Sequence, residues 1–277
     1  MNRDSRSLRM RLERRLWRSV KFVAGRNSAL GRCHVFVAGV QRSGTNMLME
    51  LLEWSRWTDV YYETDPRAFS NYRMRPREVI RALATRSRAQ SFVIKTLCEL
   101  DELRELMSDF EPAKTLWIVR RFDDSVTSAV RSFANFASQV HRLAKDKTAA
   151  EWRGNGMSDH TQQLLQQFDH ADLSEPSGAA LMWYYRNVLF FELGLQNDPR
   201  VRLLFYEDLA GDPVGTMQET FGFLGLPDWS PRVTRHVHGR SVGKSRLAAI
   251  EPGVRELCES LYSRFEALRL PGRWVQP

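Results

Sequence analysis

The chain has 277 residues, of which 43% are hydrophobic, and it carries a formal net charge of +8. This length and apolar content are sufficient for one α/β core, and the excess of cations favours anionic partners such as nucleotides, sulfated compounds, nucleic acid or acidic lipid. Cys33, Cys98 and Cys258 are far apart and lack C-x-x-C spacing, which argues against a disulfide framework or a zinc site and favours a reducing compartment. No segment approaches the roughly 20 consecutive apolar residues of a membrane span.

The N-terminal segment is basic and amphipathic. Within residues 8–24, Leu8, Leu12 and Leu16 recur at helical spacing with arginines between them. We treat residues 1–32 as an extension of a domain that spans residues 33–277. The pattern in this extension predicts a helix that either packs on the domain or contacts anionic lipid. Because the segment lacks the apolar core of about 7–15 residues that a secretory leader needs, we expect a cytoplasmic protein, with or without peripheral contact with a membrane.

Strands and helices are predicted to alternate along the rest of the chain. Residues 34–38 form an apolar, β-branched run that ends at Gly39 and predicts a buried strand. Further strands are predicted at 92–94, which ends in Lys95, at 115–119, which ends in Arg120, and at 201–206. The helices are expected at 45–56, 124–136, 177–195 and 214–225. The alternation predicts an α/β fold with a mainly parallel sheet flanked by helices, and ligands of such sheets bind at the carboxyl ends of the strands.

A glycine-containing loop joins the first strand to the first helix. Gly39 to Asn46 read GVQRSGTN, and a loop so placed aims backbone N–H groups and a helix N-terminus at an anion. The G-x-x-x-x-G frame resembles the Walker A loop, but Thr45 stands where a P-loop kinase has its phosphate-binding Lys. No apolar strand ends in an Asp that would hold magnesium. A P-loop kinase or NTPase is therefore the weaker interpretation, and a strand–turn–helix corner that binds nothing is the structural alternative.

The same loop is similar to a family motif. Arg42-Ser43-Gly44-Thr45-Asn46 resembles the [KR]-S-G-T-[TN] loop of sulfotransferases that use 3′-phosphoadenosine-5′-phosphosulfate (PAPS). The resemblance implies a P-loop-like α/β fold, PAPS as sulfuryl donor, adenosine 3′,5′-bisphosphate (PAP) as product, and no metal. It also implies that the loop, with Gly39 and Gln41, cradles the 5′-phosphate. Arg42 would stabilise the bridging oxygen and the leaving phosphate, and the residues from Ser43 to Asn46 would hold the phosphate oxygens.

A second anion site is expected directly after the third predicted strand. The family pattern R-[ND]-P-x-D-x-x-x-S grips the 3′-phosphate of the donor through its first Arg and last Ser, and Arg120 and Ser128 have that spacing. Arg offers a bidentate fork and Ser a hydroxyl donor. The chain departs from the pattern at Arg121 and Phe122, so the entry turn is expected to differ. A surface salt bridge with Asp123 or Asp124 is the alternative for Arg120.

Three downstream segments extend the resemblance, which runs from about residue 34 to 265. The run Tyr206-Glu207-Asp208-Leu209 and the later Phe223-Leu224-Gly225-Leu226-Pro227 match sequences common in this family, and we interpret them as structural. A basic loop with Lys244, Ser245 and Arg246 resembles the loop that closes over the 3′-phosphate and adenine. An exposed basic loop that binds nothing is the alternative for these three residues.

The predicted catalytic groups are Glu63, Arg42 and Lys95. In sulfotransferases that use Glu as general base, a Glu after the first helix removes the acceptor proton, and Glu63 has that place; Asp65 is the alternate base. An ion pair with Arg67 or Arg73 is the structural alternative for Glu63. Lys95 ends a buried strand and should meet an anion, which is either the transferred sulfuryl group or Glu63.

The identity of the acceptor stays open, because acceptor choice lies in variable loops such as 64–90 and 137–175. A hydroxyl or amine of a sugar, a glycolipid, a peptide or a small metabolite would suit this fold. Segment 137–175 is polar and is expected to be a surface insertion or a lid. The cations in Asn71-Tyr72-Arg73-Met74-Arg75 favour a heavily hydroxylated or acidic acceptor, so a carbohydrate is the first expectation. No nucleic-acid-binding motif is present, and we expect no such partner. A relative that has lost activity is less favoured because Glu63 and Arg42 are both present. The oligomeric state stays open.

Overall fold

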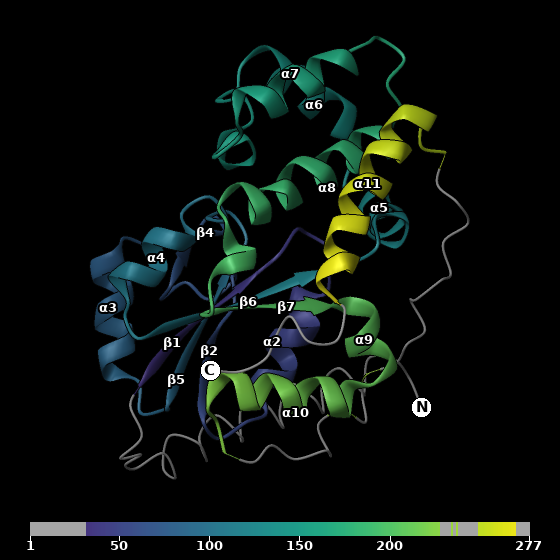
Figure 1. The fold of residues 1–277 in the computed structure, drawn as a ribbon. Coiled ribbons are helices and arrows are strands. Elements are labelled where there is room, and N and C mark those ends of the chain that lie inside the picture. The colour runs from purple at the N-terminus through teal and green to yellow at the C-terminus, as the bar shows by residue number, and fades with distance from the viewer. Residues whose placement is uncertain (1–31, 228–233, 235–236, 238–248, 270–277) are drawn as a thin grey trace, which may run out of the picture.

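The computed structural model describes residues 32–227, 234, 237 and 249–269 (Figure 1). Its centre is a sheet of five strands in the order β2-β5-β1-β6-β7, and every neighbouring pair is parallel. The strands are β1 (Cys33–Ala38), β2 (Thr58–Tyr61), β5 (Ser91–Thr96), β6 (Ala113–Val119) and β7 (Val201–Phe205). The predicted α/β fold with a parallel sheet is confirmed.

Helices cover both faces of the sheet (Figure 1). Alternate residues of β1 show why: Phe36 belongs to the core cluster that includes α8 and α11, while Val35 and Val37 belong to the cluster that includes α2 and α10. The apolar strands are therefore buried on both sides, as parallel sheets require. The helices are α2 (Thr45–Glu53), α3 (Arg77–Arg86), α4 (Leu103–Asp109), α5 (Phe122–Val130), α6 (Phe136–Lys145), α7 (Asp159–Gln167), α8 (Glu175–Glu192), α9 (Tyr206–Gly211), α10 (Pro213–Leu224) and α11 (Pro252–Leu268), with the 3-10 turns η1 (Glu151–Gly154) and η2 (Leu195–Asn197).

The structure differs from the predicted elements in three respects. First, the short edge strand β2 and the hairpin of β3 (Phe69–Ser70) and β4 (Arg73–Met74) were not predicted. Second, the helix expected over 124–136 is two helices, because the chain turns at Asn135, which has a φ of 70°. Third, the strand expected to end at Tyr206 ends at Phe205, and Tyr206 is the first residue of α9.

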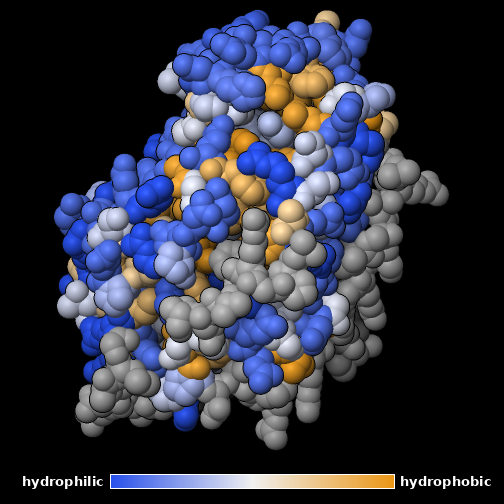
Figure 2. All heavy atoms as spheres, in the orientation of Figure 1, coloured by the Kyte–Doolittle hydropathy of each residue, from blue (hydrophilic) through white to orange (hydrophobic). Residues whose placement is uncertain are grey.

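The segment 137–175 forms α6, η1 and α7, which lie over α8 (Figure 1). Val140, Leu143 and Leu165 are buried there, so the segment has an apolar side despite its polar composition. In Figure 2 the outer surface of this layer is hydrophilic, and apolar side chains are visible between the layer and the body below it. A role as a lid stays a prediction.

Two expected elements, the helix over 8–24 and the basic loop at 241–246, lie outside the described residues. Both interpretations of the basic helix stay predictions. In the part of the chain that the structure describes, no helix is long and apolar enough to cross a bilayer.

Candidate active site

The loop between β1 and α2 depends on two glycines. Gly39 has a φ of 147°, and a Cβ there would lie 2.4 Å from the carbonyl oxygen of Ile118 in β6. Gly44 has a φ of 97°, and a Cβ there would lie 2.3 Å from the ring of Tyr206. Gly44 is also the N-cap of α2 and offers no side chain to the first turn, so the helix begins with N–H groups available to an anion. Only glycine fits both positions.

The structure brings the two predicted phosphate sites into contact. Arg42, which has a φ of 69° and an exposed side chain, donates from Nε to Ser128 Oγ of α5 at 2.8 Å. One guanidinium nitrogen of Arg120 donates to the Arg42 carbonyl oxygen at 3.3 Å. Residues from the two motifs therefore converge at the carboxyl ends of β1 and β6, where the parallel sheet predicts a ligand.

Arg120 is buried, with 6% of its surface exposed. Its guanidinium lies 4.3 Å from the centre of the Tyr206 ring and 3.9 Å from Asp124, and Trp183 of α8 donates to its carbonyl oxygen at 2.9 Å. The contact with Asp124 is the one foreseen as the alternative, but it is a buried contact within the site. Burial beside a carboxylate and an aromatic face keeps the guanidinium oriented.

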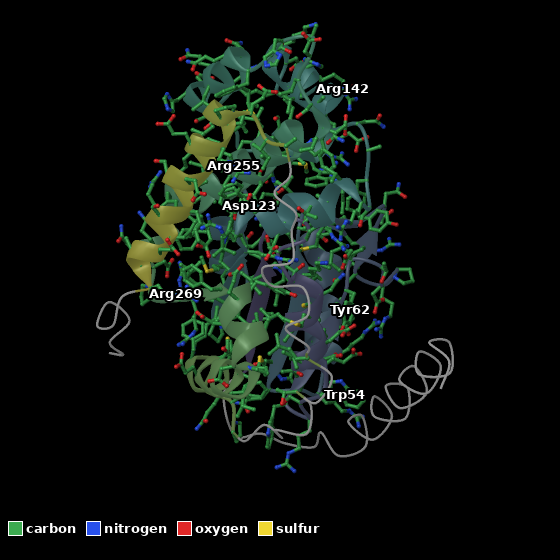
Figure 3. The ribbon with its side chains drawn as sticks, turned by 90° about the vertical axis from the view of Figure 1, so that its right-hand side faces the viewer. Trp54, Tyr62, Asp123, Arg142, Arg255 and Arg269 are labelled. Carbon is green, nitrogen blue, oxygen red and sulfur yellow. The ribbon has the colours of Figure 1, made fainter. Side chains whose placement is uncertain are left out.

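The departures from the family pattern have a local explanation. The Arg121 N–H donates to Glu207 Oε1 of α9 at 2.9 Å, and α5 begins at Phe122. Asp123 of the first turn of α5 accepts from Arg255 of α11 at 2.8 Å (Figure 3). The entry of α5 is thus held by side chains from two later helices, so the turn needs no proline.

Glu63 and Lys95 form an ion pair, with 2.5 Å between Lys95 Nζ and Glu63 Oε1. Lys95 Nζ also donates to Asn46 Oδ1 of α2 at 2.7 Å. The pairing of β2 with β5 explains the contact: Tyr61 lies opposite Ile94, so the residues that follow them meet at the same edge. Lys95 is only 3% exposed, and burial lowers the pKa of its ammonium group, an effect that the carboxylate of Glu63 opposes.

Asp65, the alternate base, has a different partner. Its two oxygens accept from Arg67, at 2.9 Å from Nε and 2.6 Å from the terminal nitrogen. Arg67 therefore pairs with Asp65 and not with Glu63, which leaves Lys95 as the partner of Glu63. Among the described residues, Glu63 Oε2 is buried without a hydrogen-bond partner. A buried carboxylate oxygen of this kind is available to accept a proton or a hydroxyl group.

A cavity of about 720 Å³ joins these groups. Of the predicted residues, its walls include Gln41, Arg42, Gly44, Thr45, Asn46, Glu63, Asn71, Tyr72, Lys95, Arg120 and Ser128. Gly39 and Ser43 lie behind this surface, and the Ser43 hydroxyl is buried without a partner among the described residues. Lys244, Ser245 and Arg246 lie outside the described residues, so their predicted contacts are untested.

Several residues of the cavity wall were not predicted. Tyr206, which we interpreted as structural, follows β7 and lies in the wall, and the rule that ligands bind at strand ends could have indicated it. The remaining residues of the wall that were not predicted come from α2, from the segments after β5 and α5, and from η1: Met47, Leu97, Cys98, Phe133, Glu151, Trp152 and Arg153. No local pattern marks these residues. Among the described residues, no group of three or more His, Cys, Asp or Glu side chains is arranged to hold a metal ion.

Comparison with known proteins identifies the family. The model of the sulfotransferase domain matches residues 32–246, and the chain therefore belongs to the sulfotransferase family. Enzymes of this family use PAPS, and this protein is a PAPS-dependent sulfotransferase.

The solved structures that align with this chain include two sulfotransferases. That of a sulfotransferase from Alicyclobacillus acidocaldarius aligns with a TM-score of 0.52 and 17% identity, over 86% of this chain and 96% of that one. A mouse sulfotransferase, SULT7A1, solved in complex with PAP, aligns with a TM-score of 0.46 and 15% identity, over 87% of this chain and 89% of its own. A search of curated proteins gave no match.

Proposed function

We propose that the enzyme transfers the sulfuryl group of PAPS to a hydroxyl group of a carbohydrate or glycoconjugate, with Glu63 as general base. The observation that carries the proposal is the contact of Glu63 with Lys95, which in turn contacts Asn46 of the phosphate loop. A carboxylate, an ammonium group and the loop that would bind the donor thus meet in one cavity. This is the arrangement that in-line transfer to a nucleophile requires.

The donor would lie across the ends of β1 and β6. The amides that begin α2 and the side chains of Thr45 and Asn46 would hold the 5′-phosphate, and Arg120 with Ser128 would hold the 3′-phosphate. Their convergence within hydrogen-bonding distance of Arg42 supports this assignment. The predicted contacts of Lys244, Ser245 and Arg246 with the 3′-phosphate and adenine belong to the same proposal.

In the reaction, the acceptor oxygen forms a bond to sulfur while the bond from sulfur to the bridging phosphate oxygen breaks. Glu63 takes the acceptor proton, which it can do while one of its oxygens stays bonded to Lys95. Lys95, as an ammonium group, stabilises the charge on the sulfuryl oxygens. Arg42 stabilises the charge that develops on the departing phosphate of PAP.

The kinds of side chain in other parts of the cavity wall support a carbohydrate acceptor. The exposed rings of Tyr72 and Phe133 line the cavity together with polar groups of Asn71, Glu151 and Arg153. Aromatic rings pack on flat apolar faces, and a few convergent polar groups orient the ligand and select its hydroxyl groups. A glycolipid, a peptide, a small metabolite or an amine would meet the same walls.

The test uses PAPS with a radiolabelled sulfuryl group and one acceptor from each class: an oligosaccharide, a glycolipid, a tyrosine peptide, a phenol and an amino sugar. Label on a saccharide hydroxyl, lost in Glu63→Gln, supports the proposal, while label only on the peptide or phenol contradicts the carbohydrate assignment. A rise in melting temperature with PAP but not with ATP and magnesium separates this donor from that of a kinase. Absence of transfer to every class would favour a relative that has lost activity.

A further inference from the structure

The wall on the acceptor side of the cavity comes from three distant segments. Tyr72 belongs to the turn of the β3–β4 hairpin, Leu97 and Cys98 follow β5, and Trp152 belongs to η1. None of these segments is a neighbour of another along the chain. Their relative positions therefore depend on contacts that join them, and two buried charged side chains, Arg186 and Glu99, make hydrogen bonds of this kind.

Arg186 joins η1 to the loop after β5. It lies on α8, is 1% exposed, and donates to four backbone carbonyl oxygens. The acceptors, at 3.2–3.3 Å, are the carbonyl oxygens of Trp152, Asn155, Leu97 and Cys98. Within the described residues no carboxylate is within salt-bridge distance of it, and burial lowers the pKa of its guanidinium.

Burial of the Arg186 guanidinium without an ion-pair partner among the described residues costs free energy. A charge removed from water without an ion-pair partner is retained only where its hydrogen bonds are well formed, and an apolar residue would fill the same space more cheaply. An apolar residue, however, cannot form the hydrogen bonds that fix the loop after β5 relative to η1. The planar fork of a guanidinium can, because its donors point in fixed directions.

Glu99 joins the same loop to the hairpin. Its Oε1 accepts from the Met74 N–H of β4 at 2.8 Å, and the side chain is 8% exposed. The neighbouring Cys98 thiol donates to the Tyr72 carbonyl oxygen at 3.4 Å. Burial raises the pKa of Glu99, which the hydrogen bond from Met74 opposes. Residues 97–99 are therefore the centre of a unit that holds the hairpin on one side and η1 on the other.

We infer that Arg186 and Glu99 are positioning residues that hold the acceptor wall in register with Lys95, which precedes this loop on β5. The inference rests on the proposed function for the location of the acceptor. The described groups proposed for the donor side lie in the loop 39–46, at Arg120 after β6 and at Ser128 on α5, and neither Arg186 nor Glu99 bonds to them. The link between Arg120 and α8 is made by Trp183 and not by Arg186. Loss of either residue should therefore disturb the acceptor side and spare the donor side.

The experiment uses the full-length protein in four variants, of which one is a control. Arg186→Lys keeps the charge but replaces the fork by a point donor, and Glu99→Ala removes the bond to the hairpin. Glu99→Gln is the rescue variant, because its amide oxygen can still accept from Met74. Arg202→Lys is the control: this Arg of β7 pairs with Glu219 and does not line the cavity.

Three quantities are measured for each variant. Calorimetry gives PAP affinity, which should stay within about twofold of wild type because the donor site is separate. Hydrogen exchange, measured both without and with PAP, should rise about tenfold in 69–75 and 97–99 for Glu99→Ala, and in 97–99 and 150–156 for Arg186→Lys. Release of radiolabelled sulfate from PAPS to water should rise about fivefold or more in both, because a loosened wall admits water to the sulfuryl group.

The outcomes are separable. The inference is supported if Glu99→Ala shows the expected rises in hydrogen exchange and sulfate release while Glu99→Gln and Arg202→Lys match wild type in both. This holds even if Arg186→Lys does not fold. Exchange that rises throughout the molecule, PAP affinity that falls with it, or sulfate release that stays unchanged or falls would overturn it. If wild-type protein binds no PAP, the proposed donor site has failed, whereas localised exchange changes would still report on the wall alone.

Discussion

Lys95 Nζ lies 2.5 Å from Glu63 Oε1, deep in the cavity and in contact with Asn46 of the phosphate loop. The pair joins two adjacent parallel strands, β5 and β2, at their carboxyl ends. Lys95 can therefore hold Glu63 in place and also stand next to a group bound by the loop. From the sequence, an ion pair with Glu63 and contact with the sulfuryl group were two alternatives for Lys95. The ion pair is what the structure contains, and contact with the sulfuryl group stays a proposal.

Replacement of Glu63 by Gln should reduce kcat by about 10²–10⁴-fold, because the amide cannot take the acceptor proton. PAP affinity should be unchanged, since the side chain is not proposed to contact the donor. Steady-state kinetics with the acceptor identified in the panel, and calorimetry with PAP, check both expectations. Asp65→Asn is the matched control, and it should retain most of the activity because Asp65 bonds to Arg67. The reverse order of effects would make Asp65 the base.

Activity should fall at alkaline pH, at a value below the ordinary Lys pKa of 10.5, because burial lowers the pKa of Lys95. The proposed role requires the ammonium form of Lys95, and in the folded enzyme this form loses its proton at a lower pH than a free Lys does. In Lys95→Arg the decline should move to higher pH, because a guanidinium keeps its proton. A pH profile of kcat gives the answer, and an alkaline limb that is identical in both enzymes would exclude Lys95 as its cause.

The lowered pKa also affects stability. Between the folded and unfolded pKa values of Lys95 the unfolded chain binds more protons at this group, so its contribution to the free energy of unfolding increases as pH rises through that window. Lys95→Met should remove this pH dependence. Urea denaturation of both proteins across the alkaline range measures it, and parallel curves for the two would contradict the expectation.

Removal of the Ser128 hydroxyl should weaken PAP binding by about three- to tenfold, the equivalent of one hydrogen bond. Adenosine 5′-phosphosulfate, which lacks the 3′-phosphate, should bind Ser128→Ala as well as it binds wild type. Ser132→Ala is the control, because Ser132 lies one turn further along the chain and its hydroxyl group donates to the Ser128 carbonyl oxygen. Calorimetry with both nucleotides tests the assignment. An equal loss for the two nucleotides would show that Ser128 does not act on the 3′-phosphate.

Gly44→Ala should lower the free energy of unfolding by about 1–3 kcal/mol. The added Cβ would meet the Tyr206 ring, and Ala rarely adopts the φ of 97° found at this position. PAP binding should weaken as well, since the ring and the loop must shift apart. The matched variant is Gly222→Ala in α10, where a Cβ has nothing within 4 Å and where Ala should be neutral or stabilising. Urea denaturation of the two proteins compares them, and equal stabilities would contradict the argument.

The parts of this protein that the sequence determined by itself are those encoded in short contiguous runs. The apolar runs of β1, β6 and β7 predicted the parallel sheet, and the glycine loop and Arg120 were expected at the strand ends where they lie. That these residues and Ser128 of α5 bind anions stays a prediction. The short strand β2 was missed, since its four residues contain too little apolar pattern.

The tertiary structure alone decided the partners. Glu63 pairs with Lys95, and not with Arg67 or Arg73, because β2 pairs with β5. The order of strands in a sheet cannot be predicted from a local sequence pattern. The same holds for Tyr206 beside Gly44 and for Arg186 between two loops: each contact joins residues far apart in the chain. Such contacts result from packing the whole domain, in which the position of one helix depends on all of its neighbours.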